Sequence, residues 1–207
     1  MDTWESISAL RDFEEYRFIK APVPVYDQVA YDLAFQRCRE NKCGTFDTNW
    51  GCNPGAKRDV AEYYKGIDYV VIMTRRFEMD YHDSELLASV TEDMQRGCRR
   101  FVLKMRDNGV DCDGFLDGPC LYCGKCAYPE PCRFPDMIMP SVSTLGIGLD
   151  KYFEMIGEPF TFQEGVINLY GFIFIKKPAG QRRTCPHPFF IISPIDRRRS
   201  RNGCEDR

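Results

Sequence analysis

The chain has 207 residues, of which 43% are hydrophobic and 29% are charged, and its formal net charge is -3. This composition excludes a disordered, collagen-like or membrane-spanning protein, and no apolar run approaches the thickness of a bilayer. The length suits one domain. We expect a single metal-binding α/β domain over residues 1–177, followed by a basic, flexible C-terminal tail over residues 178–207.

The distribution of charge bears on partners and location. Residues 176–207 carry nine Lys/Arg and three Asp/Glu, a charge of +6, so residues 1–175 carry -9. An acidic body is a poor surface for nucleic acid, which is therefore not an expected partner. The opening MDTWESISALRDFEEY lacks the basic start and apolar stretch of a secretory signal. We therefore predict a cytoplasmic protein.

A helix is expected before the first cysteine-rich segment. Val29, Leu33 and Ala34 repeat at helical spacing within VYDQVAYDLAFQRC, so Cys38 should lie at or just past the helix end. The segment that follows, CRENKCGTFDTNWGCNPG, is rich in Asn, Asp, Gly and Pro. Such a composition is typical of an irregular loop that wraps a bound group.

The remaining elements alternate between strands and helices. In chain order we expect a strand at 68–77, a long helix at 83–109, a brief strand at 113–118, a helix at 141–157, a strand at 167–177 and a short strand at 188–194. This order indicates an α/β (α+β) two-layer sandwich with cysteine-rich metal-binding loops. A ferredoxin-like topology is the finer expectation.

Eleven cysteines are the unusual feature of the chain. In a reducing compartment, clustered cysteines in odd number favour metal binding over a disulfide framework. Cys120, Cys123, Cys126 and Cys132 form C-x2-C-x2-C-x5-C. A 4Fe-4S cluster takes one thiolate per iron, and cysteines at every third residue of a curling loop can supply three corners while a fourth closes from farther along. We predict that these four residues bind a 4Fe-4S cluster.

The match to known cluster motifs is partial, and zinc is the main alternative. The last interval exceeds the x3 of the bacterial ferredoxin motif, and Arg133 stands where that motif has proline. A C-x2-C pair is also the standard zinc knuckle. Zinc sites usually join two ligand pairs across a longer insert, however, whereas three evenly spaced cysteines and one more favour a polynuclear cluster.

A second set consists of Cys38, Cys43 and Cys52, whose C-x4-C-x8-C spacing matches no standard zinc or ferredoxin pattern. Three thiolates can hold a cluster whose fourth iron is open to water or substrate, and an open position distinguishes catalytic from structural metal sites. We therefore expect a second metal site here. Two alternatives stay open: one or two of these cysteines are structural, or all three contribute to one site shared with the other set.

The other chemistry-bearing residues are expected to lie outside these sites. Cys98 falls on the apolar face of the long helix and should be a small core side chain. Cys112 is expected to be a half-buried strand-edge thiol, with a role as an additional ligand as the alternative. Cys185 and Cys204 should be incidental, and His82 a solvated residue near a helix start. No Walker loop, dinucleotide fingerprint, nucleophile elbow or H-E-x-x-H motif occurs.

Two segments, CGTFDTNWGCNPG and GPCLYCGKCAYPEPCRFPDMIMPSVSTLGIGLD, resemble the prokaryotic family of predicted metal-binding proteins known as domain of unknown function 2284. The resemblance places the cysteines of both sets at the family's two clusters. Phe46-Asp47 replace a Tyr-Gly of the family, and Asn53-Pro54 replace two prolines. The resemblance implies metal binding in a bacterial or archaeal cytoplasmic protein and assigns no reaction.

The patterns together favour an iron-sulfur protein that performs redox or Lewis-acid chemistry on a small molecule. The competing functions are a zinc-stapled, non-catalytic interaction domain and a 4Fe-4S electron carrier. The expected partner is a small-molecule substrate or a redox partner protein, without a membrane. Whether the protein is an enzyme is left open by the sequence.

Overall fold

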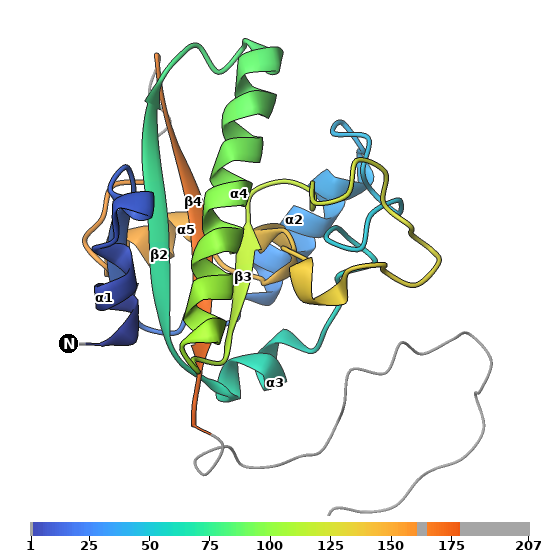
Figure 1. The fold of residues 1–207 in the computed structure, drawn as a ribbon. Coiled ribbons are helices and arrows are strands. Elements are labelled where there is room, and N and C mark those ends of the chain that lie inside the picture. Colours follow the sequence, from blue (N-terminus) through green and yellow to red (C-terminus); the bar gives the residue numbers. More distant parts are fainter. Residues whose placement is uncertain (1, 161–164, 179–207) are drawn as a thin grey trace, which may run out of the picture.

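A computed structural model of the chain describes residues 2–160 and 165–178 (Figure 1). The elements in chain order are α1 (Thr3–Ser8), η1 (Arg11–Phe13), β1 (Arg17–Ala21), α2 (Gln28–Arg39), α3 (Val60–Lys65), β2 (Ile67–Glu78), α4 (Ser84–Asp107), β3 (Cys112–Leu116), η2 (Pro135–Met137), η3 (Val142–Thr144), α5 (Leu149–Met155) and β4 (Val166–Lys176). The three η elements are short 3₁₀ helices. The expected strand at 188–194 and the tail from residue 179 lie outside the described residues.

The strands of the described chain form one antiparallel sheet in the order β1-β2-β4-β3. The long strands β2 and β4 form its centre, with Val71 opposite Ile173, and β1 and β3 form its edges. Helical segments separate all successive strands, and this order differs from the β-α-β-β-α-β order of a ferredoxin-like fold. The mixed α+β class is confirmed, whereas the ferredoxin-like topology is not.

Helices cover both faces of the sheet. Successive side chains of a strand point to opposite faces, so Val71 and Ile173 pack with α1 and α4, while Ile72 and Phe172 pack with α3 and α5. Each fully buried side chain of this size contributes about 1.5–3 kcal/mol. The domain therefore has one layer more than the two-layer sandwich that was expected.

The long helix α4 follows the sequence pattern closely. Asp83 caps it by accepting a hydrogen bond from the Leu86 N–H, and Gly109 follows its end with a φ of 78°, a value that glycine adopts readily. Cys98 lies on its buried face, and burial raises the pKa of this thiol to about 12. Cys98 is therefore a core side chain, as predicted. No helix in the described ranges is long and apolar enough to cross a membrane.

The helix expected at 141–157 is interrupted. Residues 142–144 form η3, and α5 begins only at Leu149. Between them Gly146 has a φ of 60°, a left-handed conformation that breaks a helical hydrogen-bond ladder. The sequence patterns also did not predict α1, β1 or α3.

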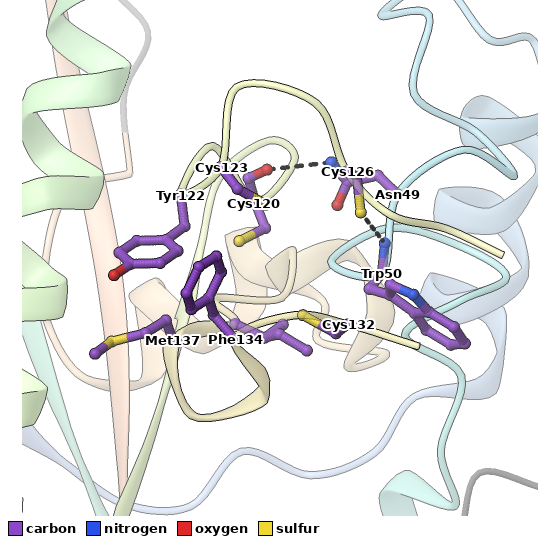
Figure 2. A pocket seen from close by; sticks show the side chains of 10 residues that line it. Asn49, Trp50, Cys120, Tyr122, Cys123, Cys126, Cys132, Phe134 and Met137 are labelled. Atoms are coloured by element: carbon purple, nitrogen blue, oxygen red, sulfur yellow. Dashed lines mark hydrogen bonds between the residues drawn. The ribbon is translucent and has the colours of Figure 1, made fainter. Parts of the chain in front are cut away.

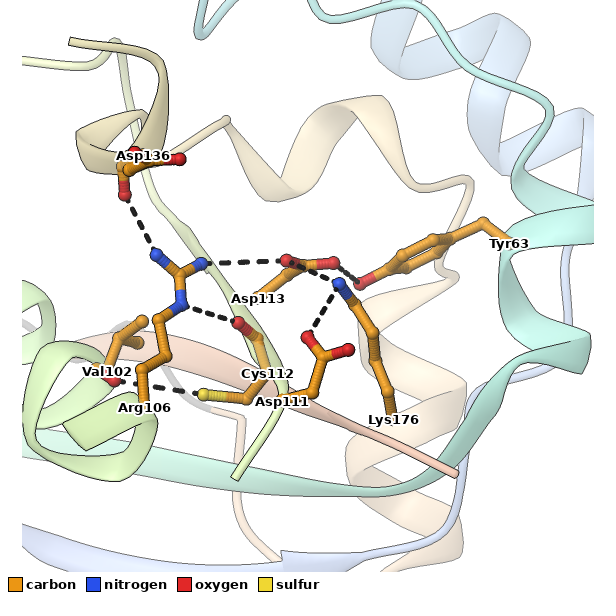
Figure 3. A network of polar contacts seen from close by, with 8 residues as sticks. All are labelled: Tyr63, Val102, Arg106, Asp111, Cys112, Asp113, Asp136 and Lys176. Atoms are coloured by element: carbon orange, nitrogen blue, oxygen red, sulfur yellow. Dashed lines mark hydrogen bonds and ion pairs between the residues drawn. The ribbon is translucent and has the colours of Figure 1, made fainter. Parts of the chain in front are cut away.

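One carboxylate ties four elements together near the sheet edge (Figure 3). Asp113 of β3 accepts a hydrogen bond from the Tyr63 hydroxyl of α3 at 3.1 Å, and it pairs with Lys176 of β4 at 3.2 Å and with Arg106 of α4 at 3.6 Å. The aromatic ring of Tyr63 lies against Phe115. This network fixes the start of β3 against both faces of the fold.

Candidate metal centre

Two loops lie side by side beyond β3: the first loop (residues 40–59) joins α2 to α3, and the second loop (residues 117–141) follows β3 (Figure 1). We use "first set" for Cys38, Cys43 and Cys52, and "second set" for Cys120, Cys123, Cys126 and Cys132. Cys38 occupies the last turn of α2, as expected. The seven cysteines are free thiols.

The second loop gathers the whole second set around one hollow (Figure 2). The hollow measures about 280 Å³ including space open to solvent, and its other lining residues are Asn49, Trp50, Tyr122, Phe134, Met137 and Ile138. Burial raises the pKa of Cys132, and nearby thiolates of the same set raise it further. The four residues predicted from their spacing are therefore brought together.

Gln95, a buried side chain of α4, holds the beginning of the second loop. Its Nε2 donates a hydrogen bond to the Pro119 carbonyl at 2.6 Å, and its Oε1 accepts one from the Leu121 N–H at 3.1 Å. These backbone groups flank Cys120 on either side, so one amide fixes the first thiol of the set. Sequence analysis did not identify Gln95. The sequence did offer a signal, because Gln95 is a polar residue beside the apolar face of α4. Buried polar groups are almost always hydrogen-bonded, so such a residue should have a partner in the fold.

Two arginines of α4 hold the far part of the second loop. Arg99 donates to the Met137 carbonyl at 3.1 Å, and its guanidinium lies 4.9 Å from the ring centre of Tyr122. Arg106 donates to the Asp136 carbonyl at 2.9 Å (Figure 3). A long helix thus supplies the rigid support for an otherwise irregular loop.

The first set also lies together, around Thr45 and Asn53. The Thr45 hydroxyl is 3.1 Å from Cys43 Sγ and 3.5 Å from Cys52 Sγ, and Asn53 Nδ2 donates to Cys38 Sγ at 3.8 Å. The hydrogen bond with Thr45 lowers the pKa of Cys43. Burial raises the pKa of Cys52, and the other two thiolates of the set raise it as well.

Asn53 carries an unpaired polar atom inside this set. The residue is 1% exposed, and among the residues that the structure describes nothing hydrogen-bonds its Oδ1. A buried acceptor left without a partner costs about 1–3 kcal/mol. Three thiols and an orphaned oxygen fit a site that receives a bound group, and sequence analysis did not identify Asn53 as part of it.

Asn49 and Trp50 of the first loop contact Cys120 and Cys126 of the second (Figure 2). The Trp50 N–H donates to Cys126 Sγ at 3.4 Å, and Asn49 Nδ2 donates to the Cys120 carbonyl at 3.1 Å. A Cβ atom at Gly51 would lie only 2.7 Å from Cys120 Cβ. The two loops therefore bring the two sets close to each other.

Asp47 also joins the two loops. Its carboxylate accepts a hydrogen bond from the Tyr128 hydroxyl at 2.7 Å. Its φ of 57° is left-handed, a conformation that glycine adopts freely and that Asp tolerates better than most residues. Asp47 thus holds a left-handed turn and adds a contact between the loops.

Other candidate ligands lie elsewhere. Cys112 lies on the edge strand β3 but is fully buried rather than half-buried as expected, and burial raises the pKa of its thiol to about 12. Its position in the hydrophobic core separates it from both sets. His82 is exposed before α4, as expected. Cys185 and Cys204 lie outside the described residues, within which no three His, Cys, Asp or Glu side chains are arranged to hold a single metal ion.

Comparison with known proteins agrees with this picture. The family described as "Predicted metal-binding protein (DUF2284)" matches residues 24–175, a stretch that contains both loops and all seven cysteines. No curated protein and no solved structure matches the chain significantly.

Proposed function

Because the chain belongs to the DUF2284 family of predicted metal-binding proteins, we propose that it is an iron-sulfur protein acting on a small molecule by redox or Lewis-acid chemistry. The second set binds a 4Fe-4S cluster, and the first set binds a second cluster. The observation that carries the proposal is that the four thiols of the second set line one hollow, to which Trp50 of the first loop is hydrogen-bonded at Cys126 Sγ.

The surroundings of the second set suit an iron-sulfur cluster. Soft thiolate ligands select copper(I), zinc and iron-sulfur clusters, and a cluster needs space between its four ligands. All four thiols line the same hollow, and the aromatic rings of Tyr122 and Phe134 shield one side of it. The Trp50 N–H points at a ligand sulfur, and hydrogen bonds to sulfur help set the reduction potential of a cluster.

The first set supports a reactive rather than a structural role. Three thiolates leave one iron of a 4Fe-4S cluster without a cysteine ligand, and an open metal position supplies Lewis acidity. Thr45 orients Cys43 and Cys52, while Asn53 donates to Cys38 and has a buried Oδ1 without a partner among the described residues. Because Asn53 Oδ1 is a hydrogen-bond acceptor, we expect the substrate to be a small molecule that carries a hydrogen-bond donor.

Metal and sulfide analysis of anaerobically purified protein tests the proposal. We expect a brown protein that contains iron and acid-labile sulfide and loses iron when Cys123 and Cys126 are replaced by serine. Cys112→Ala is the control, because this thiol lies in the hydrophobic core. Stoichiometric zinc without sulfide would overturn the proposal in favour of a zinc-stapled interaction domain. Two closed clusters that respond to no small ligand would favour an electron carrier.

A further inference from the structure

Arg58, at the end of the first loop, is a half-buried cation without a partner. Among the residues that the structure describes, no hydrogen bond or ion pair joins its guanidinium to another group. Its Nε is buried, whereas its two terminal nitrogens are not among the buried atoms that lack a partner, so they reach solvent. Charged groups taken out of water are normally paired. The guanidinium is therefore placed to receive an anion from the solvent side.

Two aromatic rings hold this guanidinium in position. Its central carbon Cζ lies 4.7 Å from the ring centre of Phe115 on β3 and 5.3 Å from the ring centre of Tyr63 on α3. The face of an aromatic ring attracts a cation without using its N–H groups. The donors of Arg58 therefore stay available in a defined orientation.

The acidic residues beside Arg58 are engaged elsewhere. Asp59, the next residue, caps α3 by accepting a hydrogen bond from the Glu62 N–H at 2.9 Å. Asp113 is held by the network of polar contacts at the sheet edge (Figure 3). Burial lowers the pKa of the Arg58 guanidinium, and the attraction of Asp113 does not offset this effect. Neither carboxylate therefore neutralises Arg58.

The charges around the network select the kind of anion. Three cations, Arg58, Arg106 and Lys176, accompany two carboxylates, Asp111 and Asp113. A ligand with one negative charge completes this balance, whereas a phosphate dianion would add a second negative charge near Asp113, and like charges repel. The planar fork of an arginine also matches the two oxygens of a carboxylate.

We propose that Arg58, held by Phe115 and Tyr63, binds the carboxylate group of a small organic acid. The terminal nitrogens donate hydrogen bonds to the two carboxylate oxygens, and no covalent bond is made or broken. The site contains no cysteine, so it does not rest on the iron-sulfur proposal.

Thermal unfolding of the full chain in acetate tests the site, with chloride at the same ionic strength as the reference. A ligand that binds only the folded protein raises its Tm, so the wild type should unfold at a higher temperature in acetate. Arg58→Lys keeps the charge but loses the fork, and the loss of one charge-assisted hydrogen bond should weaken acetate binding by about tenfold or more. Arg96→Lys is the matched control, because Arg96 is exposed on α4 and pairs with Glu92 at 3.0 Å.

Nuclear magnetic resonance supplies a readout that is independent of stability. The Nε–H resonance of Arg58 can be assigned by its absence from the spectrum of Arg58→Lys. In the wild type and in Arg96→Lys this resonance should shift to saturation as acetate is added, and chloride should not produce such a shift.

The result that would overturn the site is an equal acetate effect on the Tm of the wild type and of Arg58→Lys, or an Arg58 resonance that does not respond to acetate. A Tm increase that depends on Arg58 and is larger in inorganic phosphate than in acetate would overturn the choice of a carboxylate. Iron and sulfide are measured separately, so this proposal and the iron-sulfur proposal can fail independently of each other.

Discussion

Replacing Gly51 with alanine should disrupt the contact between the two cysteine sets. The new Cβ would lie 2.7 Å from Cys120 Cβ and 2.9 Å from the Cys120 nitrogen. Neither atom is the end of a flexible side chain, so the loops themselves must move apart. Overpacking of this kind costs about 1–3 kcal/mol, which lowers the Tm of a domain of this size by roughly 2–12 °C.

Thermal unfolding followed by circular dichroism, together with iron analysis of the same anaerobic samples, measures this effect. Gly124→Ala is the matched control, since it changes a glycine of the second loop between Cys123 and Lys125 where no described atom comes within 4 Å of the added Cβ. The control should retain the wild-type Tm and metal content. Wild-type values for Gly51→Ala would refute the reasoning, because the loops would then not be in contact at this point.

Four further variants probe other parts of the centre. Cys43→Ser should remove about half of roughly eight irons. Cyanide should perturb the spectrum of one cluster in the wild type and of none in this variant. A wild-type total near four irons would mean that both sets build one site. Asn53→Leu removes the orphaned oxygen and the donor to Cys38, so we expect a folded protein that has lost the first-set metal; full iron with an unchanged spectrum would contradict this role. Gln95→Leu leaves two backbone groups of the second loop unpaired, at a cost of about 1–3 kcal/mol each. It should lower both the Tm and the amount of iron bound by the second set. Unchanged iron would show that the loop keeps its conformation without Gln95. Burial raises the pKa of Asp117 from 3.8 to about 6. Between these pH values the carboxyl group keeps a proton in the folded protein that it releases in the unfolded chain. The free energy of unfolding therefore falls as the pH rises through this range, by at most ~3 kcal/mol. Asp117→Asn should therefore raise the Tm at pH 7 and not at pH 4, and an equal effect at both pH values would rule out this titration.

Long periodic elements were predictable from the sequence, and short ones were not. The helix α4 and the strands β2 and β4 carry 24, 12 and 11 residues, which is enough for the apolar pattern to repeat several times. The strand β1 and the helices α1 and α3 have five or six residues, so the apolar pattern repeats less than twice in each helix and little more than twice in the strand. The helix expected at 141–157 failed because its apolar spacing continues across Gly146, whose backbone conformation ends the helix.

The grouping of the cysteines into two sets was predictable because the members of each set are close together in the sequence, but the contact between the two loops was not. Asn49 and Cys120 are 71 residues apart in sequence and are joined by one hydrogen bond. No local pattern indicates that Gly51 must be small because of Cys120, or that Gln95 of a helix holds a distant loop. These contacts depend on the path of the chain between the sheet edge and the two loops.

The network around Asp113 bears on whether the chain can fold before it binds a metal. Tyr63 lies just after the first loop and Asp113 just before the second, so their hydrogen bond fixes one end of each loop without any contribution from a cysteine. Lys176 and Arg106 anchor the same carboxylate to the sheet and to α4. We therefore expect the sheet and its helices to fold before any metal is bound. The metal would then bind to two loops whose ends are already fixed.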